Sequence, residues 1–207
     1  MRQLILIGQL GMGKSSLGNA LLKQNKFSVG CQNSAVTVEV QIGESLKYKI
    51  FDCPGYGDVN DEYRFFKKFL DHKNVLINFA PINAIVIVVK FDQRESNNFL
   101  DAAKNCYSAF GKEGLKSVML VCIQANDRLI MSNADFKKCL FESDGYKFLK
   151  EKNDAQPIPY CLWDNLNPNR YPTQQEDFDD CLLHLRALDR RSLNFSFELI
   201  ERELARP

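Results

Sequence analysis

Residues 4–22 read "LILIGQLGMGKSSLGNALL" and carry the strongest structural signal in this chain. Apolar residues typical of a strand lead into a glycine-rich loop, and after the loop the apolar residues recur at helical spacing. The loop contains the spacing Gly8-x-x-x-x-Gly13-Lys14-Ser15, which is that of a phosphate-binding loop. Backbone N–H groups of such a loop, with the N-terminus of the following helix, surround a phosphate. The stretch therefore predicts a strand, loop and helix that together bind a phosphorylated ligand.

The residue types of the loop suit the parts of a nucleotide. Lys14 is expected to reach the outer phosphates, and the Ser15 hydroxyl is expected to ligate Mg²⁺. Glycines let the backbone approach the phosphates closely. The residues predicted to bind the nucleotide here are Gly8, Gly11, Met12, Gly13, Lys14, Ser15 and Ser16. The alternative is an ordinary strand–turn–helix with a chance match to the motif.

Two later segments supply the remaining phosphate and metal contacts. In "IFDCPGYGD", residues 50–58, Asp52 at the end of a strand can hold Mg²⁺ through a water, and Gly55 can offer its N–H to a γ-phosphate. In "FSVGCQNSAVTVEV", Thr37 precedes a strand, where a switch segment would supply another Mg²⁺ ligand and a γ-phosphate contact. The alternative for residues 52–55 is a simple turn. The alternative for Thr37 is a strand residue without a role in binding, because threonine has a high strand propensity.

Composition excludes several classes of protein. With 27 basic and 26 acidic residues, the chain has no overall field to attract nucleic acid. Its seven cysteines are an odd number without a C-x-x-C pair, so we expect reduced core residues rather than disulfides or a zinc site. We find no signal peptide and no apolar run long enough to span a bilayer, so the chain is expected to be soluble and cytoplasmic.

Apolar β-branched runs alternate with segments of helical period, which predicts an α/β fold with a mainly parallel sheet. Strands are expected at residues 2–8, 34–42, 46–52, 83–90, 116–123 and 157–162, the second and third forming an antiparallel hairpin around "IGESLK". Helices are expected at 14–24, 59–72, 95–110, 133–150 with a break near Gly145, and 174–204. Residues 1–173 are predicted to form one domain, and residues 174–207 a C-terminal helix packed on it.

Several segments, in this order, resemble the GIMAP family, the immunity-associated and avirulence-induced GTPases. "GQLGMGKSSLGNALL" looks like the family's phosphate loop, including the pair Gly18-Asn19; "FSVGCQNSAVTVEV" is similar to its switch segment; and "FDCPGYGD" looks like its D-T-P-G, with Cys53 in place of Thr. Residues 80–121, "APINAIVIVVKFDQRESNNFLDAAKNCYSAFGKEGLKSVMLV", resemble the box that marks the family. The resemblance covers the chain to about residue 166.

This resemblance implies a P-loop GTPase fold, the G domain. It has a six-stranded, mainly parallel sheet with one antiparallel strand, helices on both faces and a C-terminal helical extension. It also implies GTP or GDP and Mg²⁺ as cofactors, and dimerisation of two G domains across the nucleotide face when GTP is bound.

The residues expected to read the base depart from the family pattern. Asp127 in "QANDRL" matches the guanine-binding Asp, but Gln124 and Ala125 replace the residues before it. "YCLWDNLN" resembles the family's second base contact, so Trp163 could pack against the base, and Asp164 and Asn165 could make polar contacts to it. Asp127 can equally be a helix cap or turn residue, and Trp163 can equally be a core anchor.

The residues expected to drive hydrolysis also depart from the pattern of Ras-like enzymes. Tyr56 stands where a water-orienting Gln would follow the switch glycine, so intrinsic hydrolysis should be slow. Arg94 aligns with the arginine of the family box and is a candidate arginine finger for a partner's γ-phosphate, the alternative being a solvated arginine.

The sequence thus predicts a guanine-nucleotide switch with slow, Mg²⁺-dependent hydrolysis, in which Lys14, Thr37, Gly55 and Arg94 contribute to catalysis and Ser15, Thr37 and Asp52 hold the metal. Two alternatives stay open: a nucleotide-binding scaffold without turnover, and an NTPase of relaxed base specificity.

Overall fold

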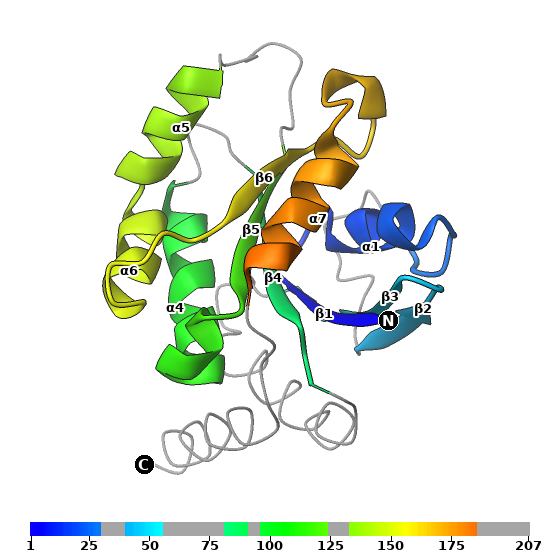
Figure 1. Ribbon diagram of the computed structural model, residues 1–207, viewed down its shortest axis with the longest axis horizontal. Helices are drawn as coiled ribbons and strands as arrows, with labels where there is room; N and C mark the ends of the chain where they lie inside the picture. Colours follow the sequence, from blue (N-terminus) through cyan, green and yellow to red (C-terminus); the bar gives the residue numbers. More distant parts are fainter. Residues whose placement is uncertain (30–39, 56–80, 91–95, 124–132, 186–207) are drawn as a thin grey trace.

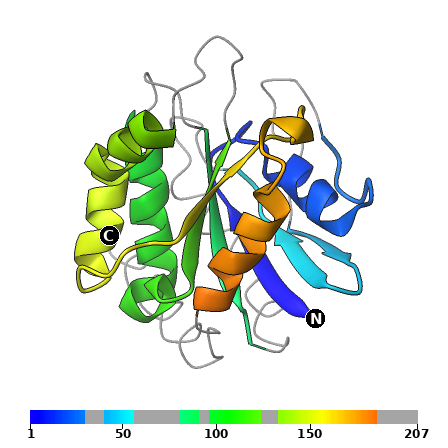
Figure 2. The same cartoon turned by 45° about the horizontal axis from the view of Figure 1, so that its top comes forward.

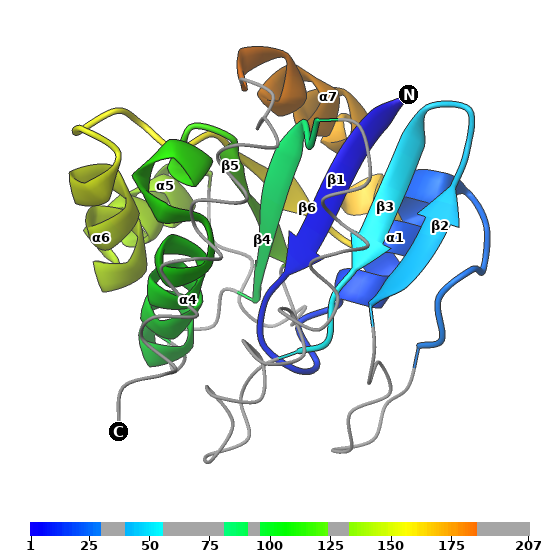
Figure 3. The ribbon, with the colours of Figure 1, turned by 90° about the horizontal axis from the view of Figure 1, so that it is seen from below.

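A six-stranded sheet forms the centre of the molecule (Figures 1 and 3). The structure is a computed structural model, and it describes residues 1–29, 40–55, 81–90, 96–123 and 133–185. The strand order is β2-β3-β1-β4-β5-β6, and every neighbouring pair is parallel except β2–β3. The strands are β1 Arg2–Ile7, β2 Gln41–Glu44, β3 Tyr48–Asp52, β4 Ala84–Lys90, β5 Val118–Ile123 and β6 Tyr160–Trp163. The expected six-stranded sheet with one antiparallel strand is confirmed.

Helices cover both faces of this sheet. On one side lie α4, Ser96–Leu115, with α5, Asn133–Glu142, and α6, Asp144–Lys152 (Figure 1). On the other side lie α1, Lys14–Leu22, and α7, Gln174–His184. A short 3₁₀ helix, η2 at Pro168–Arg170, precedes α7. Within the described residues, no helix is long and apolar enough to cross a membrane.

Successive side chains along each strand point to opposite faces of the sheet, which divides the core into two layers. In β1, Leu4 and Leu6 belong to the cluster under α1 and α7, whereas Ile5 and Ile7 belong to the cluster under α4 and α6. All four side chains are almost completely buried, as expected of a parallel sheet covered on both faces. The phosphate loop leaves the carboxyl end of β1, so this buried strand holds it in place.

The β2–β3 hairpin differs in detail from its expected position. Residues 42–44 of the expected turn belong to β2, where Ile42 lies opposite Phe51. The turn is shorter because Ser45 closes it: the Ser45 N–H donates to the Tyr48 carbonyl at 2.8 Å, and the Ser45 hydroxyl accepts from the Tyr48 N–H at 3.1 Å. Residues 34–39 of the expected strand lie outside the described residues.

The break expected near Gly145 falls two residues earlier, at Ser143, between α5 and α6. Ser143 caps α6 by accepting a hydrogen bond from the Tyr146 N–H, and its hydroxyl donates to the Leu140 carbonyl. Gly145 lies inside α6, and a Cβ there would come within 2.6 Å of the Phe99 ring on α4. The glycine therefore permits close helix packing, which its sequence context does not reveal.

The boundaries of one strand and one helix also differ from their expected positions. β6 begins at Tyr160 instead of residue 157, because Pro157 and Pro159 have no N–H for a sheet ladder. Helix α4 continues to Leu115 beyond a kink at Gly111, where φ is 62°. The expected helix at 59–72 lies outside the described residues.

Helix α7 runs beside β6 (Figure 2). Phe178 is fully buried against the sheet and packs edge-on to Trp163, with ring centroids 5.9 Å apart. The first turns of the expected C-terminal helix therefore pack on the domain, and residues beyond 185 lie outside the described residues.

Candidate functional site

The phosphate loop connects β1 to α1 in the way that its sequence predicts. Gly13, directly before α1, has a left-handed backbone with φ of 87°. A Cβ at this position would come within 2.9 Å of Ile123 Cδ1 and 3.0 Å of Asn165 Nδ2. Both the conformation and the lack of space require glycine. Of the other predicted loop residues, Gly8 and Met12 are buried, Ser16 is partly buried and Gly11 is exposed.

The structure brings Ser15 and Asp52 together from different elements. Ser15 lies in the first turn of α1, and Asp52 is the last residue of β3. The Ser15 hydroxyl donates to Asp52 Oδ2 at 2.6 Å, and Asp52 is fully buried. A hydroxyl and a carboxylate are the hard oxygen ligands that Mg²⁺ prefers, so this pair fits the expected metal site.

Lys14 is a buried amine at the head of α1. Only 6% of the residue is exposed, and its Nζ donates to the Gln9 carbonyl at 3.0 Å. Burial lowers the pKa of Lys14, although the nearby Asp52 carboxylate opposes this shift. A positive charge in such a place favours an anionic partner, and the N-terminal end of the helix dipole acts in the same direction.

Gly55 lies directly over the phosphate loop. A Cβ on Gly55 would come within 2.6 Å of Leu10 Cα and 3.1 Å of Lys14 Nζ. The D-x-x-G segment that starts at Asp52 therefore passes beside the lysine, as its predicted role in contacting phosphate requires. Between them, Cys53 is fully buried, and burial raises the pKa of its thiol.

The loop after β6 reaches the phosphate loop through Asn165. Its Nδ2 lies 3.4 Å from the Gly13 carbonyl, and its Oδ1 accepts a hydrogen bond from Trp163 Nε1 at 3.0 Å. Trp163 is 2% exposed and packs in the core against Phe178. This position fits the alternative in which Trp163 is a core anchor, and it leaves Asn165 at the surface of the site.

Asp164 organises the same loop. Its Oδ1 accepts the N–H groups of Leu166 and Asn167 at 2.8 and 2.9 Å, and its Oδ2 pairs with Arg170 at 2.8 Å. The Asp164 N–H donates to Gln174 Oε1 at 3.0 Å. Arg170 and Gln174 were not among the residues that the sequence singled out, because nothing in their local spacing marks them as partners of Asp164.

Asn19, one half of the Gly18-Asn19 pair, fixes the chain after α1. Its Oδ1 accepts the N–H groups of Phe27 and Lys26 at 2.7 and 2.9 Å, and its Nδ2 donates to the Phe27 carbonyl at 2.8 Å. The Phe27 ring packs on Gly18, where a Cβ would come within 2.6 Å of it. The pair thus holds the start of the segment that leads toward Thr37.

Three of the predicted site residues lie in parts of the chain that the structure does not describe. Thr37, Arg94 and Asp127 lie outside the described residues, as do Tyr56, Gln124 and Ala125. Their roles remain predictions.

The strand order, the single antiparallel pair and the phosphate loop between β1 and α1 define a P-loop G-domain fold. The model of the AIG1 family matches residues 2–197, almost the whole chain. The chain therefore belongs to the AIG1 family, as its resemblance to the immunity-associated GTPases predicts.

Relatives agree with this assignment at low identity. The chain is 22% identical over 170 residues to immune-associated nucleotide-binding protein 13 of Arabidopsis thaliana, a match that includes 76% of this chain. The chain spans 50% of the length of that relative.

Solved structures share the fold. Toc33 from Arabidopsis thaliana in complex with GDP and Mg²⁺ has a TM-score of 0.66 and 16% identity, with 90% of this chain and 86% of that chain covered. A second structure comes from work on chloroplast translocon components, in which dimerization is important for the GTPase activity of atToc33 and psToc159. It has a TM-score of 0.64 and 16% identity, with 91% of this chain and 86% of that chain covered.

Proposed function

We propose that this chain is a guanine-nucleotide switch that hydrolyses GTP slowly with Mg²⁺ and assembles through its G domains. The observation that carries the proposal is the contact between Ser15 Oγ and Asp52 Oδ2 at 2.6 Å, beside the buried Lys14. Two oxygen groups that can bind a metal lie next to a buried cation at a helix N-terminus. This arrangement matches the charge distribution of a nucleoside triphosphate with its metal.

Each residue of the site has a separate task. Lys14 binds the outer phosphates, and its ammonium exchanges the Gln9 carbonyl for phosphate oxygens. Ser15 and Asp52, together with Thr37, hold the metal. When bound, Mg²⁺ neutralises negative charge on the phosphate oxygens. Gly55 keeps the D-x-x-G backbone close to Lys14, so its N–H can donate to the γ-phosphate.

Base selection is proposed to depend on Asp127, whose carboxylate accepts hydrogen bonds from guanine. Adenine would leave that carboxylate without a donor, which strongly disfavours it. Asn165 lies against Gly13, and its side chain can supply a further polar contact to the nucleotide.

Hydrolysis is proposed to be slow in the monomer and faster in a dimer. Tyr56 cannot orient water as a carboxamide does, and Arg94 is a candidate to reach the γ-phosphate of a partner. The translocon structures, in which dimerization is important for GTPase activity, support this part of the proposal by similarity of fold.

Calorimetric titration of GTP, GDP and ATP with Mg²⁺ tests nucleotide binding. Tight binding of GTP and GDP is expected, and Lys14→Ala should weaken GTP binding by about 2 to 3 kcal/mol, because a buried charge-assisted contact is lost. That loss corresponds to about a 30- to 150-fold higher Kd. Lys104→Ala, which removes an exposed lysine from α4, is the matched control and should leave the Kd unchanged.

Equal affinity for ATP and GTP would refute the guanine assignment, and no binding of any nucleotide would refute the whole proposal. The turnover rate per chain should rise with protein concentration, and Arg94→Ala should remove that rise. A rate that is independent of concentration would exclude the dimer mechanism. Binding without any turnover would favour the scaffold alternative.

A further inference from the structure

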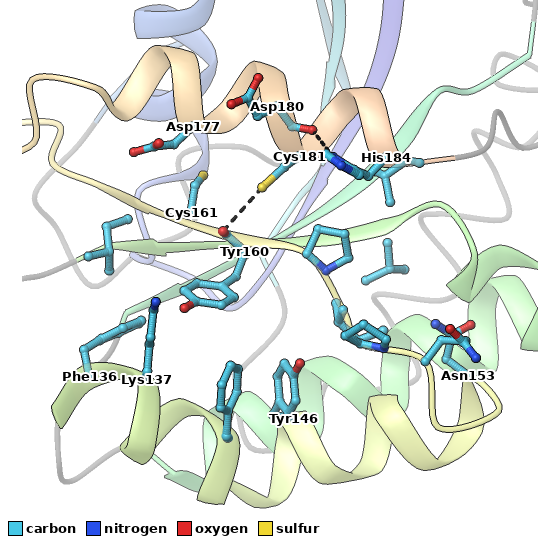
Figure 4. Close-up of a pocket in the computed structure, with 18 of the residues that line it drawn as sticks. Phe136, Lys137, Tyr146, Asn153, Tyr160, Cys161, Asp177, Asp180, Cys181 and His184 are labelled. Carbon is cyan, nitrogen blue, oxygen red and sulfur yellow. Dashed lines mark hydrogen bonds between the residues drawn. The ribbon is translucent and has the colours of Figure 1, made fainter. Parts of the chain in front are cut away.

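A groove of about 1120 Å³ lies between α7 and the α5–α6 pair, away from the phosphate loop (Figure 4). β6, the edge strand of the sheet, runs along it. Two cysteines from different elements line the groove: Cys161 on β6 and Cys181 on α7. Neither is used by the nucleotide site.

The two cysteine side chains lie next to each other. Cys181 Sγ donates to the Tyr160 carbonyl at 3.3 Å, and that carbonyl belongs to the peptide group joining Tyr160 to Cys161 (Figure 4). Cys161 is 3% exposed, while Cys181 is partly exposed to the groove. A small oxidant in the groove can therefore reach Cys181 first.

The pKa values of the two thiols shift in opposite directions. The neighbouring Cys161 thiol lowers the pKa of Cys181, although burial and the carboxylates of Asp177 and Asp180 oppose this effect. The neighbouring Cys181 thiol, together with burial, raises the pKa of Cys161. Burial raises the pKa of the other fully buried cysteines in the described residues, namely Cys53, Cys106 and Cys122. Cys181 is thus the thiol in this group with the most thiolate character.

We propose that Cys161 and Cys181 form an oxidisable dithiol, which hydrogen peroxide converts into a disulfide joining β6 to α7. The Cys181 thiolate attacks one peroxide oxygen, the O–O bond breaks, and Cys181 becomes a sulfenic acid with release of hydroxide. The Cys161 sulfur then attacks Cys181 Sγ, the S–O bond breaks, and the departing hydroxide takes the Cys161 proton. In sum, two thiols and one peroxide give one disulfide and two waters, so the dithiol loses two electrons. A thiol reductant reverses the change.

The disulfide would close the segment between residues 161 and 181, which contains the Asp164 and Asn165 loop. Because Asn165 contacts Gly13, the cross-link restrains a segment that borders the phosphate loop. Oxidation is therefore expected to raise the thermal midpoint, and dithiothreitol should return it to its starting value.

The test treats the reduced full chain with a small excess of hydrogen peroxide, then blocks the remaining thiols with an alkylating reagent. Two free thiols per chain should disappear, so the blocked chain should carry two fewer alkyl groups, and before blocking its mass should be lower by that of two hydrogen atoms. A digest without reductant should contain one cross-linked peptide pair, carrying Cys161 and Cys181. This measurement needs no variant, so it does not depend on how well substitutions fold.

Variants separate the two roles. Cys181→Ser should slow peroxide-dependent thiol loss by about tenfold, because the thiolate is gone. Cys161→Ser should trap the sulfenic acid at Cys181, which dimedone labels. Cys139→Ser, at a partly buried cysteine on α5, is the matched control and should still form the disulfide. Absence of the Cys161–Cys181 peptide in the oxidised wild type, or a cross-link through Cys122 in its place, would overturn the proposal.

Discussion

Replacing Asn19 by Ala should destabilise the domain by about 2 kcal/mol. The side chain makes three hydrogen bonds to the backbone of Lys26 and Phe27, at 2.9, 2.7 and 2.8 Å. The two bonds to Phe27 are partly buried and contribute about 1 kcal/mol each, whereas water can replace the exposed bond to Lys26 at little cost. The loss should lower the thermal midpoint by roughly 4 to 8 °C in a domain of this size.

Urea unfolding followed by circular dichroism measures this loss as a lower midpoint concentration at an unchanged slope. Asn19→Asp keeps the acceptor but not the donor, so it should lose about 1 kcal/mol, one hydrogen bond's contribution. Gln24→Ala changes an exposed residue just after α1 and should have no measurable effect. A change below about 0.5 kcal/mol for Asn19→Ala would refute the reasoning, because it would mean that water replaces all three bonds equally well.

Three further predictions concern the packing of α7, the response to acid and the loop after β6. Phe178→Ala should cost about 3 to 5 kcal/mol in chemical unfolding, because the ring is fully buried against the sheet and Trp163; a cost under 1 kcal/mol would mean that α7 does not pack there. Desolvation raises the pKa of Asp179, but hydrogen bonds from Lys47 and Tyr48 outweigh it, so the pKa is lowered overall. The ionised Asp179 therefore stabilises the fold at pH values above its unfolded-state pKa. This stability is lost as the pH falls through the folded-state pKa. Asp179→Asn should therefore make the unfolding free energy less dependent on pH below about 4, and an unchanged acid profile would contradict this. Asn165→Ala should weaken GDP binding by about tenfold, as one lost polar contact implies, and an unchanged Kd in calorimetry would remove Asn165 from the site.

The phosphate loop was predictable because its geometry is local. A buried strand, a glycine-rich turn and a helix start are determined by residues close together in the chain, and the structure has β1, Gly13 and α1 where the motif requires them. The meeting of Ser15 with Asp52 was also predictable, because parallel neighbouring strands β1 and β3 end at the same edge of the sheet.

Gly145 shows what local reasoning leaves out. Glycine in a helical segment usually indicates a break, and the sequence predicted a break near this residue. In the fold, α6 packs so closely on Phe99 of α4 that only glycine fits, and the break falls at Ser143, which can cap the next helix. The need for glycine at position 145 depends on a side chain some 45 residues earlier in the chain, which no local pattern contains.

The sequence by itself therefore determined the class of fold and the family, and it predicted which residues bind phosphate and metal, because these follow from motifs of fixed spacing. Only the tertiary structure decided that Trp163 is packed in the core, that Asp164 pairs with Arg170, and that the Cys181 thiol lies against the backbone next to Cys161. These contacts join residues whose spacing in the chain carries no pattern, so they exist only once β6 and α7 have packed together.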